Sequence, residues 1–275
     1  MNSHALSGQR TDQNLSDKTE NMTRSNFLTC AVALAATASA TALHAQSHEI
    51  KFSADFAVEI EDDFTFESTD NAVELNDLFA TVEGAFGLEF GQGTSINATF
   101  LFEPIADAVN DREFEDHGLF VEELYVAHEF AKGSVLAGKF DPAFGFAWDA
   151  APGIYGADFA EDYELAELIG FSASVPFGLF DGEAVVTGSL YMVDRTFLSD
   201  SLVNSRGNTS LNDCGVPNTK APINFALTLF CETASELNYN LGFRIQDGGT
   251  RGGGTTEYGV VGCLTKAVEF GSSEV

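Results

Sequence analysis

The chain has 275 residues, enough for one large domain or two small ones. Its 13 basic residues face 42 acidic ones, and a formal net charge of -29 argues against nucleic acid or anionic lipid headgroups as partners. Two interpretations of the acidity remain, a well-solvated acidic surface and an acidic pore or cation-binding loops.

The N-terminus has the pattern of an export signal. Residues 1–21 are polar and without periodicity, and we predict an untranslated or disordered leader there. Residues 22–45 combine the basic Arg24, an apolar core and small residues before a cut after Ala45, which is typical of a secretory signal peptide. A transmembrane anchor is the weaker alternative, because the core is short and rich in Ala, Thr and Ser. Residues 46–275 form the exported part.

The exported part opens with an unusually long alternating segment. Between residues 48 and 62, every second residue is apolar and those between are mostly polar or acidic. This pattern predicts a strand with one apolar and one polar face, roughly 40 Å long at the usual rise per residue. Such a length is typical of a tilted strand that crosses a bilayer.

Similar segments recur along the chain. In chain order they cover residues 78–90, 96–102, 120–130, 135–140, 169–175, 184–192, 223–229 and 237–246, with a ragged tenth candidate at 258–270. In the fourth segment Phe120, Leu124 and Val126 share the apolar face. Glu122 and His128 fall in phase with them, which indicates a local bulge or an interface position.

Short and long connections alternate between these strands. The pattern predicts an all-β, antiparallel up-and-down transmembrane β-barrel with about ten strands visible, either complete or a truncated piece of a larger barrel. A soluble β-sandwich or a lipocalin-like barrel is the alternative, since both also alternate, but their strands are usually shorter.

The polar face of a membrane barrel lines its lumen and selects the solutes that pass. We predict Asp55, Glu59, Glu83, Glu89 and Arg244 as pore-lining residues, and the excess of carboxylates favours cations. The alternative is that these carboxylates are paired or hydrated and select nothing, because charges are screened across a wide aqueous pore.

Chemistry has little support in the sequence. No histidine stands beside a nucleophile in a known motif, and the cysteines have no metal-binding spacing. Acidic loops lack the Gly and Asn spacing of a calcium site. We expect no enzyme, no catalytic residue, no metal and no cofactor.

One long connection, residues 141–165, is too aromatic for a solvated loop. We predict Phe144, Phe146, Trp148 and Asp149 in it as a constriction folded into the lumen. A loop folded onto the barrel rim is the alternative.

The stretches FVEELYVAHEF, LAGKFDPAFGFAWDAAPGIYG and DFAEDYELAELIGF resemble Gram-negative outer-membrane porins, in particular the siderophore-porin type and more distantly the phosphate-selective porins. In those families a strand ending in Gly-Lys-Phe or Gly-Lys-Tyr leads to a Pro-Phe-Gly loop. The matching positions here are Gly138, Lys139, Phe140, Pro142, Phe144 and Gly145.

Two features depart from the families. The strands lack the basic ladder of the phosphate-selective members, so anion selectivity is not carried over. Members also close with a terminal aromatic, whereas Phe270 lies five residues before the end, so the chain is a candidate for a truncated or frameshifted member.

The expected function is passive diffusion of small hydrophilic solutes, cation-preferring or metal-chelating, through the outer membrane of a Gram-negative bacterium. Outer-membrane lipid and small solutes are the expected partners, nucleic acid is not, and both a monomer and a homotrimer stay open. A non-conducting structural or adhesive barrel is the alternative, and an outer-membrane hydrolase the third.

Overall fold

The computed structural model describes residues 27–29, 32–36, 50–150, 160, 163–249, 254–266, 269–270 and 273–274. For residues 27–29, 32–36, 149–150, 269–270 and 273–274 it describes only the backbone. The predicted leader and most of the predicted signal peptide lie outside these ranges. Within them, no helix has the length and apolar character needed to cross a membrane.

The chain is all-β, as the sequence predicts, with almost no helix. Its strands are β1 (Phe27–Thr29), β2 (Val32–Ala36), β3 (Lys51–Thr65), β4 (Asn76–Glu89), β5 (Thr94–Pro104), β6 (Arg112–Glu113), β7 (His117–Phe130), β8 (Gly133–Phe140), β9 (Leu168–Leu179), β10 (Gly182–Val193), β11 (Asn224–Thr233), β12 (Leu237–Asp247), β13 (Thr256–Lys266), β14 (Glu269–Phe270) and β15 (Ser273–Glu274). The helical turns are η1 (Asn71–Val73), α1 (Ala147–Ala150) and η2 (Phe197–Ser199).

One antiparallel, up-and-down sheet dominates the molecule. Eleven strands follow one another in the order β1-β3-β4-β5-β7-β8-β9-β10-β11-β12-β13, while β2 pairs with β3, and β6 pairs with β4 in parallel. Among the described residues no pairing joins β13 to β3, so the sheet is open. The up-and-down prediction is confirmed, and closure into a barrel is not.

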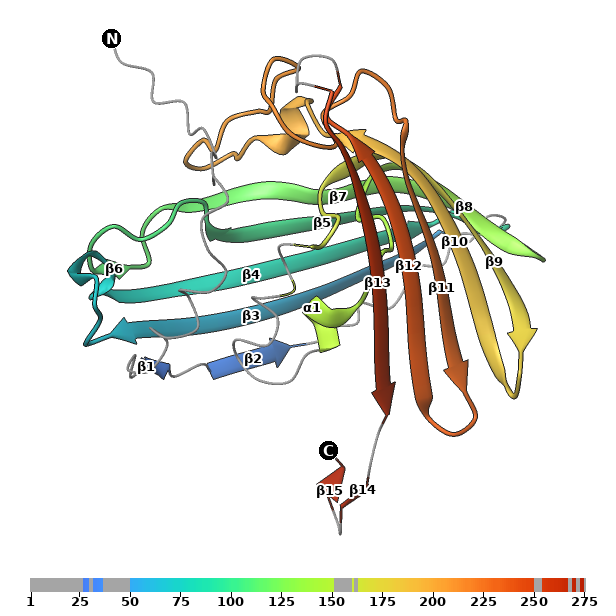
Figure 1. The fold of residues 1–275 in the computed structure, drawn as a ribbon, viewed down its shortest axis with the longest axis horizontal. Helices are drawn as coiled ribbons and strands as arrows, with labels where there is room; N and C mark the ends of the chain where they lie inside the picture. Colours follow the sequence, from blue (N-terminus) through green and yellow to red (C-terminus); the bar gives the residue numbers. More distant parts are fainter. Residues whose placement is uncertain are drawn as a thin grey trace.

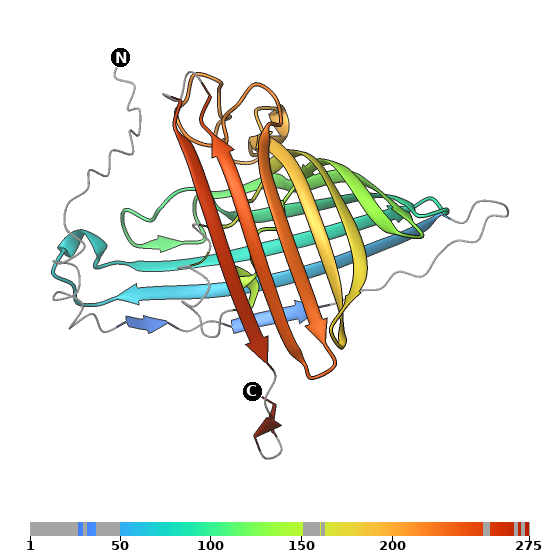
Figure 2. The ribbon, with the colours of Figure 1, turned by 45° about the vertical axis from the view of Figure 1, so that its right-hand side comes forward.

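The sheet is strongly curved. Figures 1 and 2 show β9–β13 running steeply across the direction of β3–β5, with α1 on the inside of the curve. Because the strands are antiparallel, the strand ends that are joined by the long connections, residues 66–75, 105–116, 141–167, 194–223 and 248–255, all lie at one end of the sheet. The short turns lie at the other end.

The short turns need special backbone conformations. In the β4–β5 turn, Gly91, Gln92 and Gly93 have φ angles of 75°, 54° and 80°. A Cβ atom at Gly93 would lie 2.4 Å from the carbonyl oxygen of Glu129 on β7. The GQGT sequence therefore supplies both the left-handed backbone and the close approach that this turn requires.

The ten predicted alternating segments correspond to β3, β4, β5 and β7–β13, including the ragged last one. The exception lies within β7. There Thr99 pairs with Glu123 but Phe100 pairs with Val121, so Glu122 is an extra residue. This is the bulge that the sequence indicated, and it reverses the facing of the residues before it. The prediction that Phe120 shares the apolar face of Leu124 is therefore wrong; Phe120 is 2% exposed.

Strand β8 is short, and a connection replaces it. Its pairing with β7 ends at Leu124, so the first half of β7 has no strand on that side. The segment around Ser201 covers this edge. Leu202 N–H donates to Leu119 O at 2.7 Å, and the Asn204 side chain donates to His117 O at 2.9 Å. The open backbone groups of β7 are thus satisfied without another strand.

Candidate functional site

The two faces of the sheet have opposite character, and we define them by cross-strand rows. The inner face contains the row of directly opposed residues Asp55, Ala85, Thr99 and Glu123. The outer face contains the intervening residues. It exposes large apolar side chains on almost every long strand: Phe52, Phe56, Ile60, Leu88, Ile96, Leu124, Val126, Val135, Phe171, Val175, Leu227, Leu241, Phe243, Val260 and Leu264.

Buried side chains show the same inversion. Among the described residues, more polar or charged side chains than hydrophobic ones are buried. On β9–β11 the inner face carries a row of small polar residues in which Ser174, Thr187 and Thr228 are directly opposed. Water-soluble domains bury their apolar side chains instead, so this sheet has the reverse arrangement.

The register places the predicted acidic residues Asp55, Glu59, Glu83 and Glu89 together on the inner face of β3 and β4. Asp55 and Glu59 are exposed there. Glu89 lies 4.0 Å from Lys51, and both side chains are more than half exposed. Such an exposed pair is screened by water and contributes little to stability. This part of the inner face is therefore an open acidic wall.

Arg244, the predicted basic residue, lies on the inner face of β12 beneath the 141–148 segment. Its guanidinium carbon is 4.7 Å from the centre of the Phe144 ring, and Nη1 donates to Tyr163 O at 2.9 Å. Arg244 thus contacts both ends of the long connection. A cation over an aromatic face is stabilising, more so when both are desolvated.

The 141–148 segment packs on the inner face of β10–β13. Phe144 is 3% exposed and packs with Leu168, Tyr191 and Ala226. The Thr228 hydroxyl donates to Ala143 O at 2.7 Å. The segment therefore lies inside the curve of the sheet.

The other predicted loop residues differ in what the structure describes. Trp148 packs against the Phe144 cluster, and Phe146 meets Phe230 edge to face with ring centres 5.9 Å apart. The side chain of Asp149 lies outside the described residues.

The β7 bulge brings carboxyl groups together where the long connection begins. Glu123 accepts from Thr99 at 3.3 Å and from the Asp141 N–H at 3.4 Å. Asp141 in turn accepts from the Glu167 N–H at 2.6 Å. Burial, together with the charges of Glu123, Glu164 and Glu167, raises the pKa of Asp141 to about 7.

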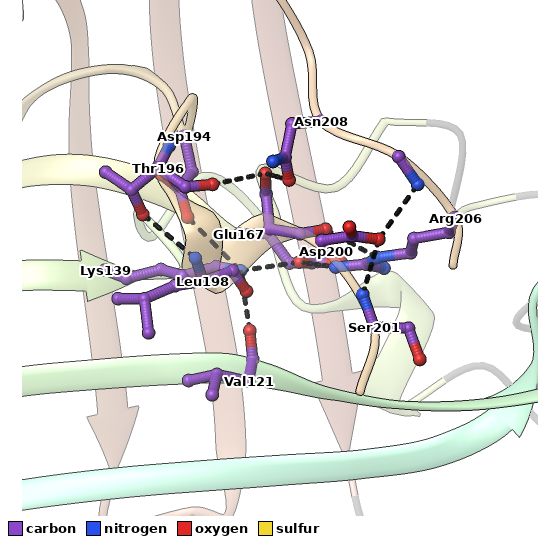
Figure 3. A network of polar contacts seen from close by, with 12 residues as sticks. Val121, Lys139, Glu167, Asp194, Thr196, Leu198, Asp200, Ser201, Arg206 and Asn208 are labelled. Atoms are coloured by element: carbon purple, nitrogen blue, oxygen red, sulfur yellow. Dashed lines mark hydrogen bonds and ion pairs between the residues drawn. The ribbon is translucent and has the colours of Figure 1, made fainter. Parts of the chain in front are cut away.

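A buried ion-pair network lies beside this group, at the gap that the short β8 leaves in the sheet (Figure 3). Lys139 Nζ donates to Glu167 at 2.7 Å and to Val121 O at 2.6 Å, and lies 3.6 Å from Asp194. Arg206 binds both oxygens of Glu167. The Lys139 side chain is fully buried, so it does not face open solvent. Its contacts instead link the strands and connections on the two sides of the gap.

In comparisons with protein-family models, with characterised proteins and with solved structures, nothing matches this chain. The porin resemblance therefore rests on the sequence stretches alone, and family membership stays a prediction.

In the part of the chain that the structure describes, no group of three or more His, Cys, Asp or Glu side chains is placed to hold a metal ion. The inner face carries exposed carboxylates on β3 and β4, small polar side chains on β9–β11, and Arg244, which binds the long connection. Sequence reasoning did not foresee the Lys139–Glu167–Arg206 network, because its members are far apart in the chain and only the shortness of β8 brings them together.

Proposed function

We propose that the chain is a passive pore of a Gram-negative outer membrane, which admits small hydrophilic solutes and prefers cations. One observation carries the proposal: the sheet is apolar on its exposed outer face and polar or charged on its inner face. In water such an exposed apolar surface would promote aggregation, whereas in a bilayer its side chains contact the lipid hydrocarbon chains. The outer face then contacts lipid, and the inner face lines an aqueous path.

Strand lengths and aromatic side chains support the same placement. All of the ten long strands except the eight-residue β8 have 10 to 15 residues, which suits tilted strands across the hydrocarbon core. Exposed phenylalanines lie at both ends of the strands, Phe90, Phe130 and Phe180 at the short-turn end and Phe64, Phe66 and Phe114 at the other. Membrane barrels carry such aromatic girdles where lipid meets water.

The proposal requires the sheet to close. The ten long strands alternate in direction, so β3 and β13 are antiparallel and their outward edges have the geometry to pair. In the structure the edge of β3 is paired with β1 and β2, which belong to the predicted signal peptide. Removal of residues 1–45 on export would leave this edge for β13.

Selectivity follows from the charges of the inner face. Asp55, Glu59 and Glu83 lie on β3 and β4. Of the inner-face cations, Lys51 lies 4.0 Å from Glu89 and Arg244 is engaged by the long connection. The potential inside the path is therefore negative, which attracts cations.

Single-channel recording in a planar bilayer tests the proposal, with the chain from Gln46 onward refolded and a KCl gradient across the membrane. We expect stepwise currents and a reversal potential whose sign shows that K⁺ crosses the pore more readily than Cl⁻. Replacing Asp55, Glu59 and Glu83 by their amides reduces that potential, while the exposed-turn variant Lys132→Gln does not reduce it. A folded, inserted protein without current would refute the pore and favour a closed structural barrel.

A further inference from the structure

A pocket of about 800 Å³ lies on the inner face, at the end that carries the long connections. Its wall consists of inner-face residues from four neighbouring strands, among them Asp63 on β3, Phe79 on β4, Glu103 on β5 and Phe120 on β7. The connections at residues 66–75 and 105–111 contribute an apolar rim. Small-molecule sites commonly have this size and this mixture of surfaces.

Both arginines of the pocket use their hydrogen bonds within the protein. Arg112 donates to the two carboxylate oxygens of Asp77 at 2.6 and 2.5 Å, and its third nitrogen donates to Ala106 O at 2.7 Å. Arg206 binds Glu167 through two nitrogens and Ser199 O through the third. All three nitrogens of each guanidinium group therefore have protein acceptors and each positive charge is paired with a carboxylate, which weakens the attraction of an anionic ligand.

The carboxylates decide the sign of the pocket. Its lining contains four of them, Asp63, Asp77, Glu103 and Asp107, against the two arginines. Asp63 and Glu103 also interact with other groups of the protein, and Asp107 is exposed on the connection. The excess negative charge is concentrated in a concave space, where low-dielectric walls strengthen its field.

The apolar part of the lining adds a second requirement. Val73, Leu75, Ile105, Phe79 and Phe120 line the pocket. Phe120 is only 2% exposed, because the Arg206 guanidinium covers its ring, so the accessible apolar surface comes mainly from the other four residues. A hydrated inorganic ion gains nothing from these surfaces, whereas a cation that carries a hydrocarbon group buries it there. Charge and surface together select an amphiphilic cation.

We propose that this pocket binds small organic cations that carry an apolar group, at the long-loop entrance of the path. The assignment rests on the proposed function and names a solute class for it. The pocket holds the ammonium group near Asp63, Glu103 and Asp107, and the hydrocarbon against the aromatic and aliphatic wall.

Calorimetric titration of the refolded protein in detergent micelles tests this assignment, with benzyltrimethylammonium as the probe. Benzyl alcohol and benzenesulfonate serve as neutral and anionic probes of similar size. We expect saturable binding of the cation alone. The double variant Asp63→Asn/Asp107→Asn weakens it by about tenfold, since charges a few ångströms from the ligand are removed. The single variant Asp107→Asn, at an exposed loop position, covers the case in which the double variant does not fold.

The matched control is Glu115→Gln, which removes an exposed carboxylate of the same 105–116 connection that does not line the pocket. It leaves the affinity unchanged. Equal binding of the sulfonate, or no saturable binding of the cation to folded protein, overturns the assignment. Bilayer currents from the same preparation separate the two proposals: currents without cation binding contradict only the pocket, and cation binding without currents contradicts only the pore.

Discussion

Lys139 and Glu167 form a buried ion pair, with Nζ and Oε2 2.7 Å apart and the lysine side chain fully excluded from solvent. The pair joins the penultimate residue of β8 to the residue before β9, so it links the two ends of the long connection. It also faces Asp194, whose side chain is 1% exposed. The gap left by the short β8 is therefore bridged by a fully buried lysine charge, the buried Asp194 and Glu167, whose side chain is 26% exposed.

Removing the lysine charge tests this role. Lys139→Met leaves Glu167 and Asp194 short of one buried cation, and breaking a buried pair in this way typically costs about 3–5 kcal/mol. We expect a large drop in the urea concentration at which the refolded protein unfolds. Lys132→Met, at an exposed turn, serves as the control and leaves the midpoint unchanged. An equal midpoint in both variants would contradict a structural role for the network.

Asp141 predicts a pH dependence of stability. Its pKa is raised from 3.8 to about 7, chiefly by burial, so the folded state prefers the protonated acid. The contribution of this group to stability is thus full below about pH 4 and lost as the pH rises through about 7. Asp141→Asn replaces the carboxyl group by a neutral amide, whose oxygen can still accept the hydrogen bond from the Glu167 N–H.

The expected result for Asp141→Asn is a gain in stability at pH 8, at most about 4 kcal/mol from the size of the shift, and little change at pH 4. Thermal unfolding followed by gel mobility at the two pH values measures it. The control is Asp107→Asn, which removes an exposed carboxylate and is expected to change the stability equally at pH 4 and pH 8. A gain at pH 4 as large as at pH 8 would show that ionisation is not the cause.

Closure of the sheet predicts a cross-link between β3 and β13. A protein without residues 1–45 carries Ala57→Cys on the inner face of β3, with Cys214 and Cys231 replaced by Ser. It is paired in turn with Val261→Cys, native Cys263 or Thr265→Cys, which share the inner face of β13. Cys263 is also replaced by Ser in the two combinations that do not use it. We expect a disulfide in one combination after mild oxidation of the folded protein and in none in urea. Three unlinked folded proteins would mean that the sheet stays open.

The sequence predicts the strands well, but it predicts poorly the β-bulge and the tertiary contacts between strands and connections. Alternation is a local property, so β3, β4 and β12 are visible from single segments. The facing of Phe120 was missed because the extra residue Glu122 is revealed only by the partner strand β5. Tertiary contacts also decide where Lys139 lies: the register puts it opposite Leu124, yet its amine reaches Val121 and Glu167. No local pattern contains these relations.

The inner position of the 141–148 segment depends on a glycine. A Cβ atom at Gly242 on β12 would lie 2.0 Å from the carbonyl oxygen of Phe144, a distance that no side chain can occupy. Since the blocking atom belongs to the backbone, the segment itself must move. Gly242→Val is therefore expected to displace Phe144 from the inner face while the strand, where valine is favourable, stays formed.

Displacement has two readouts. Single-channel conductance rises, since the segment no longer narrows the path, and limited proteolysis cuts within residues 141–165 sooner than in the unchanged protein. The control is Gly262→Val on β13, where the nearest atom to an added Cβ is a Leu241 methyl group at 3.6 Å, an ordinary contact. It leaves conductance and cleavage unchanged. Faster cleavage without higher conductance would mean that the segment packs inside the sheet but does not constrict a path.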